Sequence, residues 1–363
     1  MASVTVLDRE DAPPARVLEI SDPSVGLDAV VVIDHDLFPM SAGGTRMIPD
    51  VTTDEVARLA RAMTWKFAVA GLEYAGAKAG IRFAGGDRAA LLDAYFERLG
   101  VLGDSFLTGP DMGTHPDDFL RFVPDDEPAP LWARTHDGMG MDDLAVGHGI
   151  KGAAAVALEQ LERPWDGATV AIEGFGKAGA GTARVCARAG ARVIAVSTIE
   201  GALIDPDGLD VEELLELREE HGDAFVHHGP VAARPRSDLF DTECDILVPG
   251  ARPDVISPAV ASNLRCAAVV PVANAPYARG SLEVLHRRGI LALPDFVTNA
   301  GGVQLYEAPD CQEEDPTRCL DAVERLVGDT VRRVLETSAA DAGTPTTSAL
   351  GIARDYLRAH AQG

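Results

Sequence analysis

Alternating hydrophobic and polar positions near the N-terminus predict two β-strands. The segments RVLEI (16–20) and AVVVID (29–34) carry this pattern. Residues 54–70 place their apolar residues at helical spacing instead, and Thr53 is the expected N-cap. A second helix is expected over 89–100, where a glycine would end it. The apolar face of the first helix consists of Val56, Leu59, Ala60, Met63 and Phe67.

The middle of the chain runs in the order strand, helix, strand between residues 168 and 197. This order implies parallel strands with a right-handed crossover, and the fold class is therefore α/β. Three later apolar runs fit buried parallel strands that lead into loops. Those runs are 244–250, 267–274 and 289–295, further helices are expected at 148–162, 317–339 and 347–361, and 124–141 is expected to be a connection.

The composition is that of a globular protein with room for two domains. The chain has 363 residues, of which 46% are hydrophobic. It contains no apolar run of the ~18 residues that a membrane span needs. The N-terminus lacks a basic segment followed by an apolar one, so we expect a cytoplasmic protein. Five widely spread cysteines show no metal-ligand spacing, and we expect them to be reduced and no metal to be bound: Cys186, Cys244, Cys266, Cys311 and Cys319.

The net charge is strongly negative. With 57 acidic and 32 basic residues the chain carries −25, which disfavours nucleic acids and anionic membranes as partners. The acidic residues are dispersed, and nearly all basic residues are arginine. Such a surface suits a halophilic source, although a GC-rich genome explains the arginine bias equally well. The chain's four lysines are Lys66, Lys78, Lys151 and Lys177.

A glycine-rich turn follows the first strand of the central unit. Gly174, Gly176 and Gly179 form GxGxxG between a strand and a helix. Such glycines allow a tight turn, close approach of the backbone to a pyrophosphate and close packing of helix on strand. The turn therefore predicts a Rossmann-type site for a dinucleotide, contacted by Gly174, Phe175, Gly176, Lys177, Ala178 and Gly179.

The second strand of this unit bears on the choice between NAD and NADP. Ser197 and Thr198 occupy the place where an acidic residue usually binds the ribose 2′-hydroxyl, and Glu200 follows two residues later. A small polar residue there could admit a 2′-phosphate. No Arg or Lys follows to pair with that phosphate, however, and Glu200 would repel it. Both cofactors stay open, with NAD slightly favoured.

Seven motifs in sequence order resemble those of the glutamate/leucine/phenylalanine/valine dehydrogenases. The resemblance runs from about residue 30 to residue 305, and each motif alone is weak. The motifs are PMSAGGTRM (39–47), MTWKFAVAG with AGAKAGI (63–81), TGPDMGT (108–114), IEGFGKAG (172–179), CDILVPGA (244–251), VANAP (272–276) and LPDFVTNAGGV (293–303).

The resemblance implies reversible oxidative deamination of an L-amino acid to a 2-oxo acid and ammonia, with hydride passing to NAD or NADP. It also implies a homo-oligomer and two domains separated by a cleft. We expect an N-terminal α/β substrate domain over 1–140, completed by helices in 331–363. A Rossmann dinucleotide-binding domain is expected over 141–330.

Three charged residues match the chemistry that the resemblance implies. Lys66 matches the lysine that holds the substrate α-carboxylate. Lys78, which we expect in a loop of Ala and Gly, matches the base that activates water, because a lysine shielded beside another cation gives up its proton more readily. Asp111 matches the carboxylate that exchanges protons with the substrate nitrogen. Singly, each has an ordinary reading as a surface lysine or a turn aspartate; together, upstream of the glycine turn, they favour catalysis.

Further residues match the family near the nicotinamide and the substrate. Asn274, with Ala273 beside it, and Asn299 match residues near the nicotinamide ribose and the substrate carboxylate, although asparagine is also common in turns. Gly43 and Gly44 are expected beside the substrate. The neighbouring histidines 227 and 228 lie in a polar stretch, and we expect them to be solvated.

The substrate side chain is predicted to be nonpolar. The glutamate-specific members of the family that this chain resembles carry a lysine just before the two glycines, where this chain has Ala42. They also carry a serine at the position where this chain has Tyr306. Without those anchors a buried γ-carboxylate would lack a partner, which is costly. The expected pocket residues are Met40, Ala42, Val303 and Tyr306.

Two alternatives stay open. The segment GALIDPDGLDVEELLE (201–216) resembles the glutamate enzymes more than the leucine ones. A glutamate dehydrogenase that uses Arg46 as an unusual anchor for the distal carboxylate is therefore the first alternative. The second is a non-catalytic binding paralogue, which would not need Lys66, Lys78 and Asp111 together.

Overall fold

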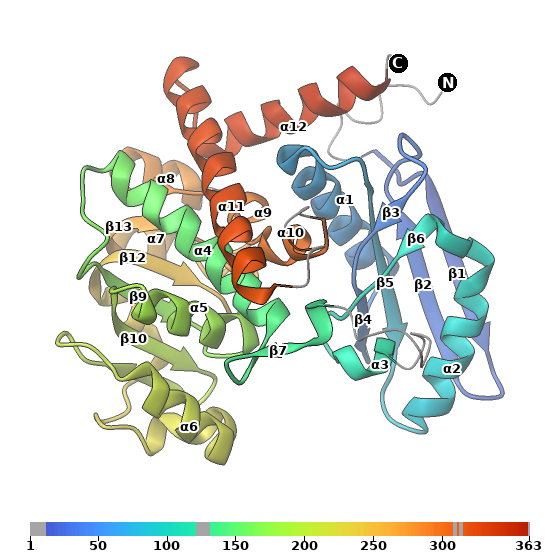
Figure 1. Cartoon of the computed structure of the whole chain (residues 1–363), viewed down its shortest axis with the longest axis horizontal. Helices are drawn as coiled ribbons and strands as arrows, with labels where there is room; N and C mark the ends of the chain where they lie inside the picture. Colours follow the sequence, from blue (N-terminus) through green and yellow to red (C-terminus); the bar gives the residue numbers. More distant parts are fainter. Residues whose placement is uncertain (1–11, 121–130, 308–310, 312–314, 362–363) are drawn as a thin grey trace. The chain divides into compact units, whose positions relative to one another are not determined.

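The chain forms two compact units. A computed structural model describes residues 12–120, 131–307, 311 and 315–361 (Figure 1). One unit comprises residues 1–133 and 350–363, and the other comprises 134–349. The sequence assigns 331–363 to the first domain, but helix α11 (Pro316–Ala340) packs along helix α4 (Met141–Gln160) in the second unit. Only the last part of α12 (Pro345–Ala361) joins the first unit.

A mixed six-stranded sheet forms the centre of the first unit. The two strands that the N-terminal pattern predicts, β1 and β2, pair in antiparallel fashion, and β2 pairs antiparallel with β5. Strands β3 and β4 run parallel to β5, and β6 follows β3 at the edge. The strands are β1 (Arg16–Asp22), β2 (Leu27–Ile33), β3 (Ser41–Ala42), β4 (Thr45–Ile48), β5 (Ala75–Arg82) and β6 (Phe106–Leu107).

Strand β5 corrects the expectation that Lys78 lies in a loop. Its small residues allow close packing and are not a sign of irregular chain. A Cβ atom on Gly76 would lie 2.2 Å from the Ala60 carbonyl oxygen of helix α1 (Thr53–Ala70), and one on Gly80 would lie 2.8 Å from Val56. Alternate residues of β5, Ala75, Ala77, Ala79 and Ile81, face helix α2 (Arg88–Leu99) in the opposite core.

Helix α1 is capped one residue earlier than predicted. The side chain of Thr52 accepts a hydrogen bond from the backbone N–H of Glu55, and Thr53 is the first helical residue. The helix ends at Gly71, which has a left-handed backbone conformation. Both ends follow from local chemistry, and only the choice between two adjacent threonines needed the structure.

The second unit has a doubly wound sheet. Its strand order is β11-β10-β9-β12-β13-β14, with β11 antiparallel and the others parallel. The chain leaves β9 on one side towards β10 and later returns to β12 on the other, which is where such sheets bind ligands. The elements are β9 (Thr169–Glu173), α5 (Lys177–Arg188), β10 (Arg192–Thr198), β11 (Gly201–Ile204), β12 (Glu243–Pro249), β13 (Arg265–Val269) and β14 (Leu291–Ala292).

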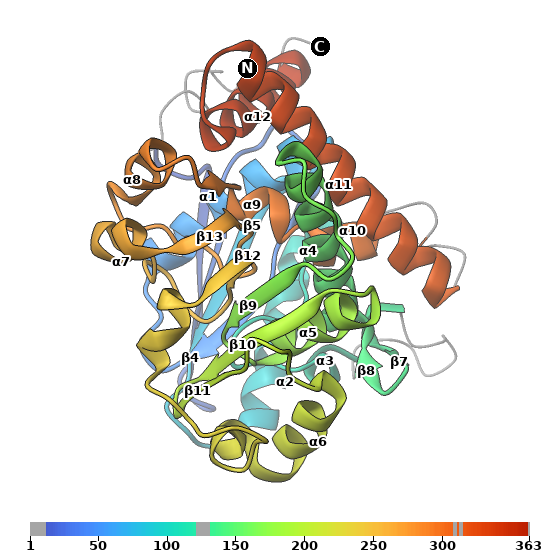
Figure 2. The ribbon, with the colours of Figure 1, turned by 90° about the vertical axis from the view of Figure 1, so that its left-hand side faces the viewer.

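Helices cover both faces of this sheet (Figure 2). Ala171 packs with residues of α7 (Pro258–Asn263) and α8 (Ser281–Arg287) in one core. The next residue, Ile172, faces the helix α5 side, where a Cβ atom on Gly179 would lie 3.6 Å from it. The predicted α/β class is thus confirmed, with the alternation of strand side chains serving two helical layers.

Helix α4 begins at Met141, seven residues before its predicted start. Its N-terminal glycines look like helix breakers in the sequence, but they permit close contacts. A Cβ atom on Gly147 would lie 2.7 Å from the backbone of Gly181 in α5, and one on Gly149 would lie 3.1 Å from Gly301 in α10 (Gly301–Glu307). The predicted connection 124–141 otherwise lies partly outside the described residues.

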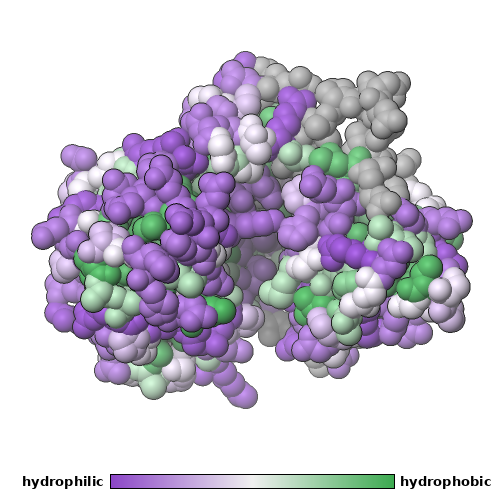
Figure 3. All heavy atoms as spheres, turned by 90° about the horizontal axis from the view of Figure 1, so that it is seen from below, coloured by the Kyte–Doolittle hydropathy of each residue, from purple (hydrophilic) through white to green (hydrophobic). Residues whose placement is uncertain are grey.

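Smaller elements complete the two units. They are α3 (Pro116–Leu120), β7 (Thr135–His136), β8 (Met139–Gly140), α6 (Val211–His221) and α9 (Asp295–Thr298), with 3₁₀ segments over 100–105, 131–133, 222–227 and 236–241. Within the described parts of the chain, no helix is both long and apolar enough to cross a membrane. Hydrophilic residues cover most of the surface visible in Figure 3.

The structure corrects one expectation about the cysteines. Cys311 and Cys319 form a disulfide, so the prediction that all five are reduced is wrong for this pair. Both are buried near the start of α11, and the sequence gives no sign that residues eight apart would meet there. Cys186, Cys244 and Cys266 are buried free thiols.

Candidate functional site

Lys78 and Asp111 meet in the first unit. Residue 78 pairs with Val32 on the neighbouring strand β2, and its side chain lies on the same face of β5 as Gly76 and Gly80. Lys78 Nζ lies 3.1 Å from Asp111 Oδ2, and the lysine side chain is 9% exposed. Two residues predicted as base and proton carrier are therefore an ion pair largely shielded from water.

The glycine pair between β3 and β4, Gly43 and Gly44, makes room for this ion pair. A Cβ atom on Gly43 would lie 1.7 Å from the Ala77 carbonyl oxygen. One on Gly44 would lie 2.9 Å from the Pro110 carbonyl oxygen and 3.2 Å from Lys78 Nζ. Any side chain at either position would push β5 or the Asp111 loop away, so both glycines are required by the close approach.

A second cation, Arg46, contacts the same oxygen of Asp111 as Lys78 does. Arg46 Nε donates to Asp111 Oδ2 at 3.0 Å, and the Arg46 guanidinium also pairs through Nη1 with Glu55 on α1. Burial alone would raise the pKa of Asp111, but Lys78 and Arg46 outweigh it and lower the pKa to about 2. Asp111 is therefore a carboxylate at neutral pH.

The Asp111 loop is fixed by its own backbone contacts. The Asp111 N–H donates to Thr114 Oγ1 at 2.8 Å, and that hydroxyl donates to the Thr45 carbonyl at 2.9 Å. Thr114 is buried. Sequence reasoning did not identify Thr114 or Glu55, although Thr114 belongs to the TGPDMGT motif that contains Asp111.

The other predicted substrate residues of this unit flank the ion pair along the chain. Met40 and Ala42 are partly buried just before the glycine pair, and the Met40 carbonyl accepts a hydrogen bond from Ala75 N at the start of β5. Lys66 lies near the C-terminal end of α1 and is partly buried. Its role in binding a carboxylate stays a prediction.

In the second unit the glycine turn packs closely at Gly179 and is open at Gly176, which suits the predicted pyrophosphate site. A Cβ atom on Gly179 would lie 1.9 Å from the Gly174 carbonyl oxygen, so α5 packs tightly against the end of β9. At Gly176 a Cβ atom would meet nothing within 4 Å, which leaves open space above the turn. No side chain caps the N-terminus of α5, so the first-turn N–H groups of the helix are suited to an anion.

Among the other predicted residues of the turn, Phe175 is buried and Lys177 and Ala178 begin helix α5. The Phe175 ring packs against Phe225, with ring centroids 5.2 Å apart. This contact joins the turn to the 3₁₀ segment 222–227, which also borders the end of β10.

Ser197 and Thr198 are both buried with engaged hydroxyl groups. Ser197 Oγ accepts from the Gly174 N–H at 3.2 Å, and Thr198 Oγ1 donates to the Asp223 carbonyl at 2.8 Å. Ile199 and Glu200 follow with exposed side chains, and the N–H of Glu200 donates to Thr198 Oγ1. Both hydroxyls thus hydrogen-bond to the backbone around the turn, and their contact with the cofactor stays a prediction.

A buried glutamate links two strand ends beside the turn. Glu173, the last residue of β9, is 1% exposed and accepts hydrogen bonds from the N–H groups of Gly250 and Ala251 just after β12. Sequence reasoning missed Glu173, and a charged residue that ends an apolar strand next to GxGxxG was the available signal.

The predicted asparagines also come together. Asn299 Nδ2 donates to Asn274 Oδ1 at 2.9 Å, while the N–H of Ala273 donates to the carbonyl of Pro249, the last residue of β12. The loop after β13 and the end of α9 therefore meet the strand ends that carry the glycine turn. Val303 and Tyr306 lie three residues apart on the short helix α10, and Tyr306 is 39% exposed.

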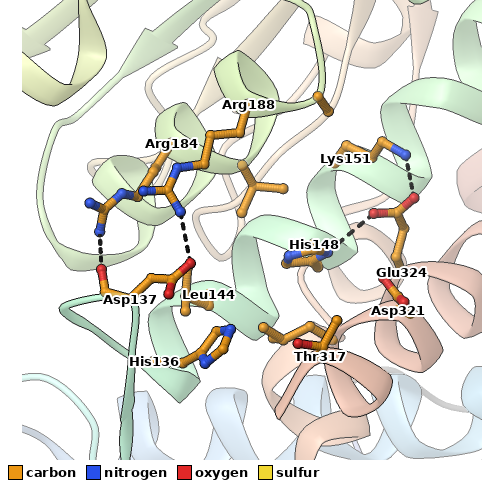
Figure 4. A pocket seen from close by; sticks show the side chains of 13 residues that line it. His136, Asp137, Leu144, His148, Lys151, Arg184, Arg188, Thr317, Asp321 and Glu324 are labelled. Atoms are coloured by element: carbon orange, nitrogen blue, oxygen red, sulfur yellow. Dashed lines mark hydrogen bonds and ion pairs between the residues drawn. The ribbon is translucent and has the colours of Figure 1, made fainter.

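A separate cavity of about 280 Å³ lies among α4, α5, α11 and the β7–β8 hairpin (Figure 4). Several of its charged residues form ion pairs with one another. Arg188 Nη1 lies 3.1 Å from Asp137 Oδ2, and His148 Nδ1 lies 3.1 Å from Glu324, which also pairs with Lys151. None of the predicted site residues lines this cavity, and its ion pairs hold the helices that flank the glycine turn.

The described residues contain no group of three His, Cys, Asp or Glu side chains arranged to hold a metal. His228 stacks on His221 with ring centroids 3.8 Å apart, while His227 beside it is exposed.

Comparison with known proteins gives the family. The description "Glu/Leu/Phe/Val dehydrogenase, dimerisation domain" matches residues 14–121, and "Glutamate/Leucine/Phenylalanine/Valine dehydrogenase" matches 138–308. A glutamate dehydrogenase of Thermotoga maritima is 34% identical over 284 residues, covering 72% of this chain and 67% of the relative. An NADP-specific glutamate dehydrogenase of Saccharolobus shibatae is 32% identical over 280 residues, covering 72% and 65%.

A solved structure agrees over nearly the whole chain. The hetero-hexameric glutamate dehydrogenase of Thermus thermophilus, in a leucine-bound form, has a TM-score of 0.85 and 26% identity, covering 98% of this chain and 91% of that one. The resemblance found in the sequence motifs is thereby confirmed. The chain belongs to the glutamate/leucine/phenylalanine/valine dehydrogenase family, whose members are amino acid dehydrogenases.

Proposed function

We propose that this protein catalyses reversible oxidative deamination of a nonpolar L-amino acid to its 2-oxo acid and ammonia, with NAD as the preferred cofactor. The observation that carries the proposal is the shielded Lys78–Asp111 ion pair in a member of this family. A nicotinamide cofactor would be held at the glycine turn of Gly174, Gly176 and Gly179 and would supply a hydride acceptor for the substrate Cα. The chain's own residues supply the charges and proton transfers.

Each residue of the first unit has a distinct task. Lys66 binds the substrate α-carboxylate as a fixed cation. Asp111, a carboxylate at neutral pH, accepts a proton from the substrate nitrogen. Lys78, in its neutral form, takes a proton from the water that attacks the iminium carbon. Asp111 returns its proton to the nitrogen of the resulting amino alcohol, which collapses to the 2-oxo acid and ammonia as its hydroxyl proton passes to solvent.

The engagement of Arg46 supports a nonpolar substrate. Arg46 is the cation nearest in sequence to the glycine pair, and it is paired with both Asp111 and Glu55 at 11% side-chain exposure. Binding a γ-carboxylate would require it to leave those partners. Ala42 offers no charge in its place, and a buried carboxylate without a partner is costly.

Glutamate is the second candidate substrate. The observation that favours it is the identity of 34% and 32% with glutamate dehydrogenases. For the cofactor, exposed Glu200 at the end of β10 favours a free ribose 2′-hydroxyl over a phosphate, since like charges repel. We also propose a homo-oligomer, supported by the dimerisation domain that matches residues 14–121.

The test is formation of reduced cofactor with leucine, valine, phenylalanine and glutamate, each with NAD and with NADP. The proposal expects the highest kcat/KM for a nonpolar amino acid with NAD. Glutamate as the best substrate would select the second candidate, and no turnover with any pair would select a binding paralogue.

The variant Lys78→Ala tests the base. It should abolish turnover while NADH binding, measured by fluorescence, stays at its wild-type Kd. Lys151→Ala serves as the matched control, because Lys151 pairs with Glu324 in the other unit, and it should keep turnover. Substantial activity in Lys78→Ala would refute the role of Lys78.

A further inference from the structure

We propose that Arg46 is a positioning residue that keeps Asp111 oriented and ionised before each proton transfer, and that Glu55 holds Arg46 in place. The proposal rests on the function proposed above and deepens it. It replaces the earlier alternative, in which Arg46 anchors a distal substrate carboxylate.

The geometry places two cations on one oxygen. Arg46 Nε and Lys78 Nζ lie 3.0 Å and 3.1 Å from Asp111 Oδ2. Arg46 is on β4 and Lys78 on β5, and these parallel strands pair Arg46 with Gly80, so both side chains lie on the face towards α1. Strand pairing therefore fixes the Arg46 stem in relation to Lys78.

The two cations differ in what they can do during the reaction. A lysine that takes part in proton transfer alternates between charged and neutral forms. An arginine cannot lose its proton in a protein. When Lys78 is neutral, Arg46 is the remaining positive charge on Asp111, and it keeps the aspartate ionised and able to accept the substrate proton.

Glu55 completes a chain of alternating charges. The charged groups that face Asp111 are Lys78 from β5 and Arg46 from β4, with Glu55 from the first turn of α1 beyond Arg46. Glu55 takes Nη1 of the guanidinium and leaves Nε directed at Asp111. This split arrangement orients the arginine, whereas a free arginine would be available to a substrate carboxylate.

The experiment compares the pH dependence of kcat in wild type, Arg46→Gln, Arg46→Lys and Glu55→Gln. In Arg46→Gln, the acid limb should move to higher pH by about one unit or more, because Asp111 loses one of its two cations. kcat should fall more than tenfold, in the ~10²-fold range typical of lost proton-transfer geometry, while KM changes little. Arg46→Lys should restore the acid limb in part, and Glu55→Gln should lower kcat without moving KM.

Arg98→Gln is the matched control. Arg98 forms another arginine–aspartate pair of the same unit, at 2.5 Å from Asp22, away from the Lys78 pair. It should leave the pH profile and kcat unchanged. A wild-type pH profile in Arg46→Gln would overturn the proposal, and so would a loss confined to KM for glutamate, which would identify a substrate anchor.

A measurement without substrate separates this proposal from the function. The ¹³C NMR signal of the Asp111 carboxyl group, assigned through Asp111→Asn, reports its protonation in the free protein. It should change towards the protonated form at higher pH in Arg46→Gln than in wild type. Identical titration curves would overturn the positioning role even if no amino acid were turned over, whereas absent turnover with shifted curves would count against the proposed function alone.

Discussion

Two partly buried carboxyl groups in this chain, Asp111 and Asp143, have opposite electrostatic surroundings. Burial favours the neutral form of both Asp111 and Asp143. At Asp111 two cations reverse the effect, whereas at Asp143 the neighbouring Asp142 adds to it and outweighs Lys177 and Arg218. The pKa of Asp111 falls to about 2 and that of Asp143 rises to about 7. Neutral pH thus leaves Asp111 fully charged and Asp143 near its midpoint.

Asp143→Asn should stabilise the protein at pH 8 and have little effect near pH 4. The folded-state pKa of about 7 lies above the ordinary aspartate value of 3.8, so ionising Asp143 costs folding free energy. That cost is absent below the unfolded pKa, grows as pH rises towards 7 and is complete above it. Since one pKa unit corresponds to about 1.4 kcal/mol, the shift from 3.8 to about 7 sets an upper limit of about 4 kcal/mol on the gain at pH 8.

Thermal unfolding across pH measures this effect. The exposed Asp50 supplies the control, since Asp50→Asn should give the same small change at every pH. A Tm difference between Asp143→Asn and wild type that does not grow from pH 4 to pH 8 would contradict the prediction.

Some residues of the site could be predicted from the sequence, and others could be found only from the structure. Lys78 and Asp111 could be selected from motifs, because the chemistry requires those residue types. Glu55 and Asp143 could not, since each matters through a neighbour distant in sequence or through burial. Glu55 lies nine residues from Arg46, and only the pairing of β4 with β5 and the packing of α1 bring its charge to the site.

At the scale of elements, α4 is the helix on which the second unit is assembled. Its glycines admit α5 at Gly147, α10 at Gly149 and α11 at Gly152. These contacts place the helix of the glycine turn and the helix that carries Val303 against one support.

Gly152→Ala should destabilise the protein by about 1–3 kcal/mol, the usual cost of overpacking. Its Cβ atom would lie 2.2 Å from the Glu324 carbonyl oxygen, and backbone cannot move aside cheaply. Gly351 on α12 is the matched control, because a Cβ atom there meets nothing within 4 Å. Gly351→Ala should be neutral or stabilise by up to about 1 kcal/mol. Urea unfolding measures the free energy of unfolding of both variants, and equal changes in the two would contradict the packing argument.

Strand periodicity and glycine turns made most of the parallel sheet predictable. β9, α5 and β10 follow from apolar runs around GxGxxG. The errors share a cause, which is that small residues mark both loops and close packing. AGAKAGI predicts a loop but forms strand β5, and the helix predicted from about residue 148 begins at Met141. Only the three-dimensional neighbours of those glycines distinguish the two cases.

For the whole molecule, the charge of −25 predicts a response to salt. Repulsion among dispersed carboxylates opposes compaction, and ions screen it, with a Debye length of about 10 Å at 0.1 M falling to about 3 Å at 1 M. We expect Tm to rise between 0.1 and about 2 M KCl, most steeply at the low end. NaCl should act alike, because screening depends on ionic strength. A Tm independent of both salts would contradict a halophilic origin.

The first unit is discontinuous in sequence, and this has a consequence for synthesis on the ribosome. Its core is closed by α12, where Arg354 lies over the Trp65 ring at 5.7 Å and His360 packs on Phe38 at 5.5 Å. Those partners are separated by the whole of residues 134–349. During synthesis, Trp65 and Phe38 of the N-terminal segment therefore stay uncovered by α12 until residues 134–349, the second unit, have been synthesised. Early chaperone binding should accordingly concentrate on residues 1–133, which are synthesised before residues 134–349 but complete their fold only after them.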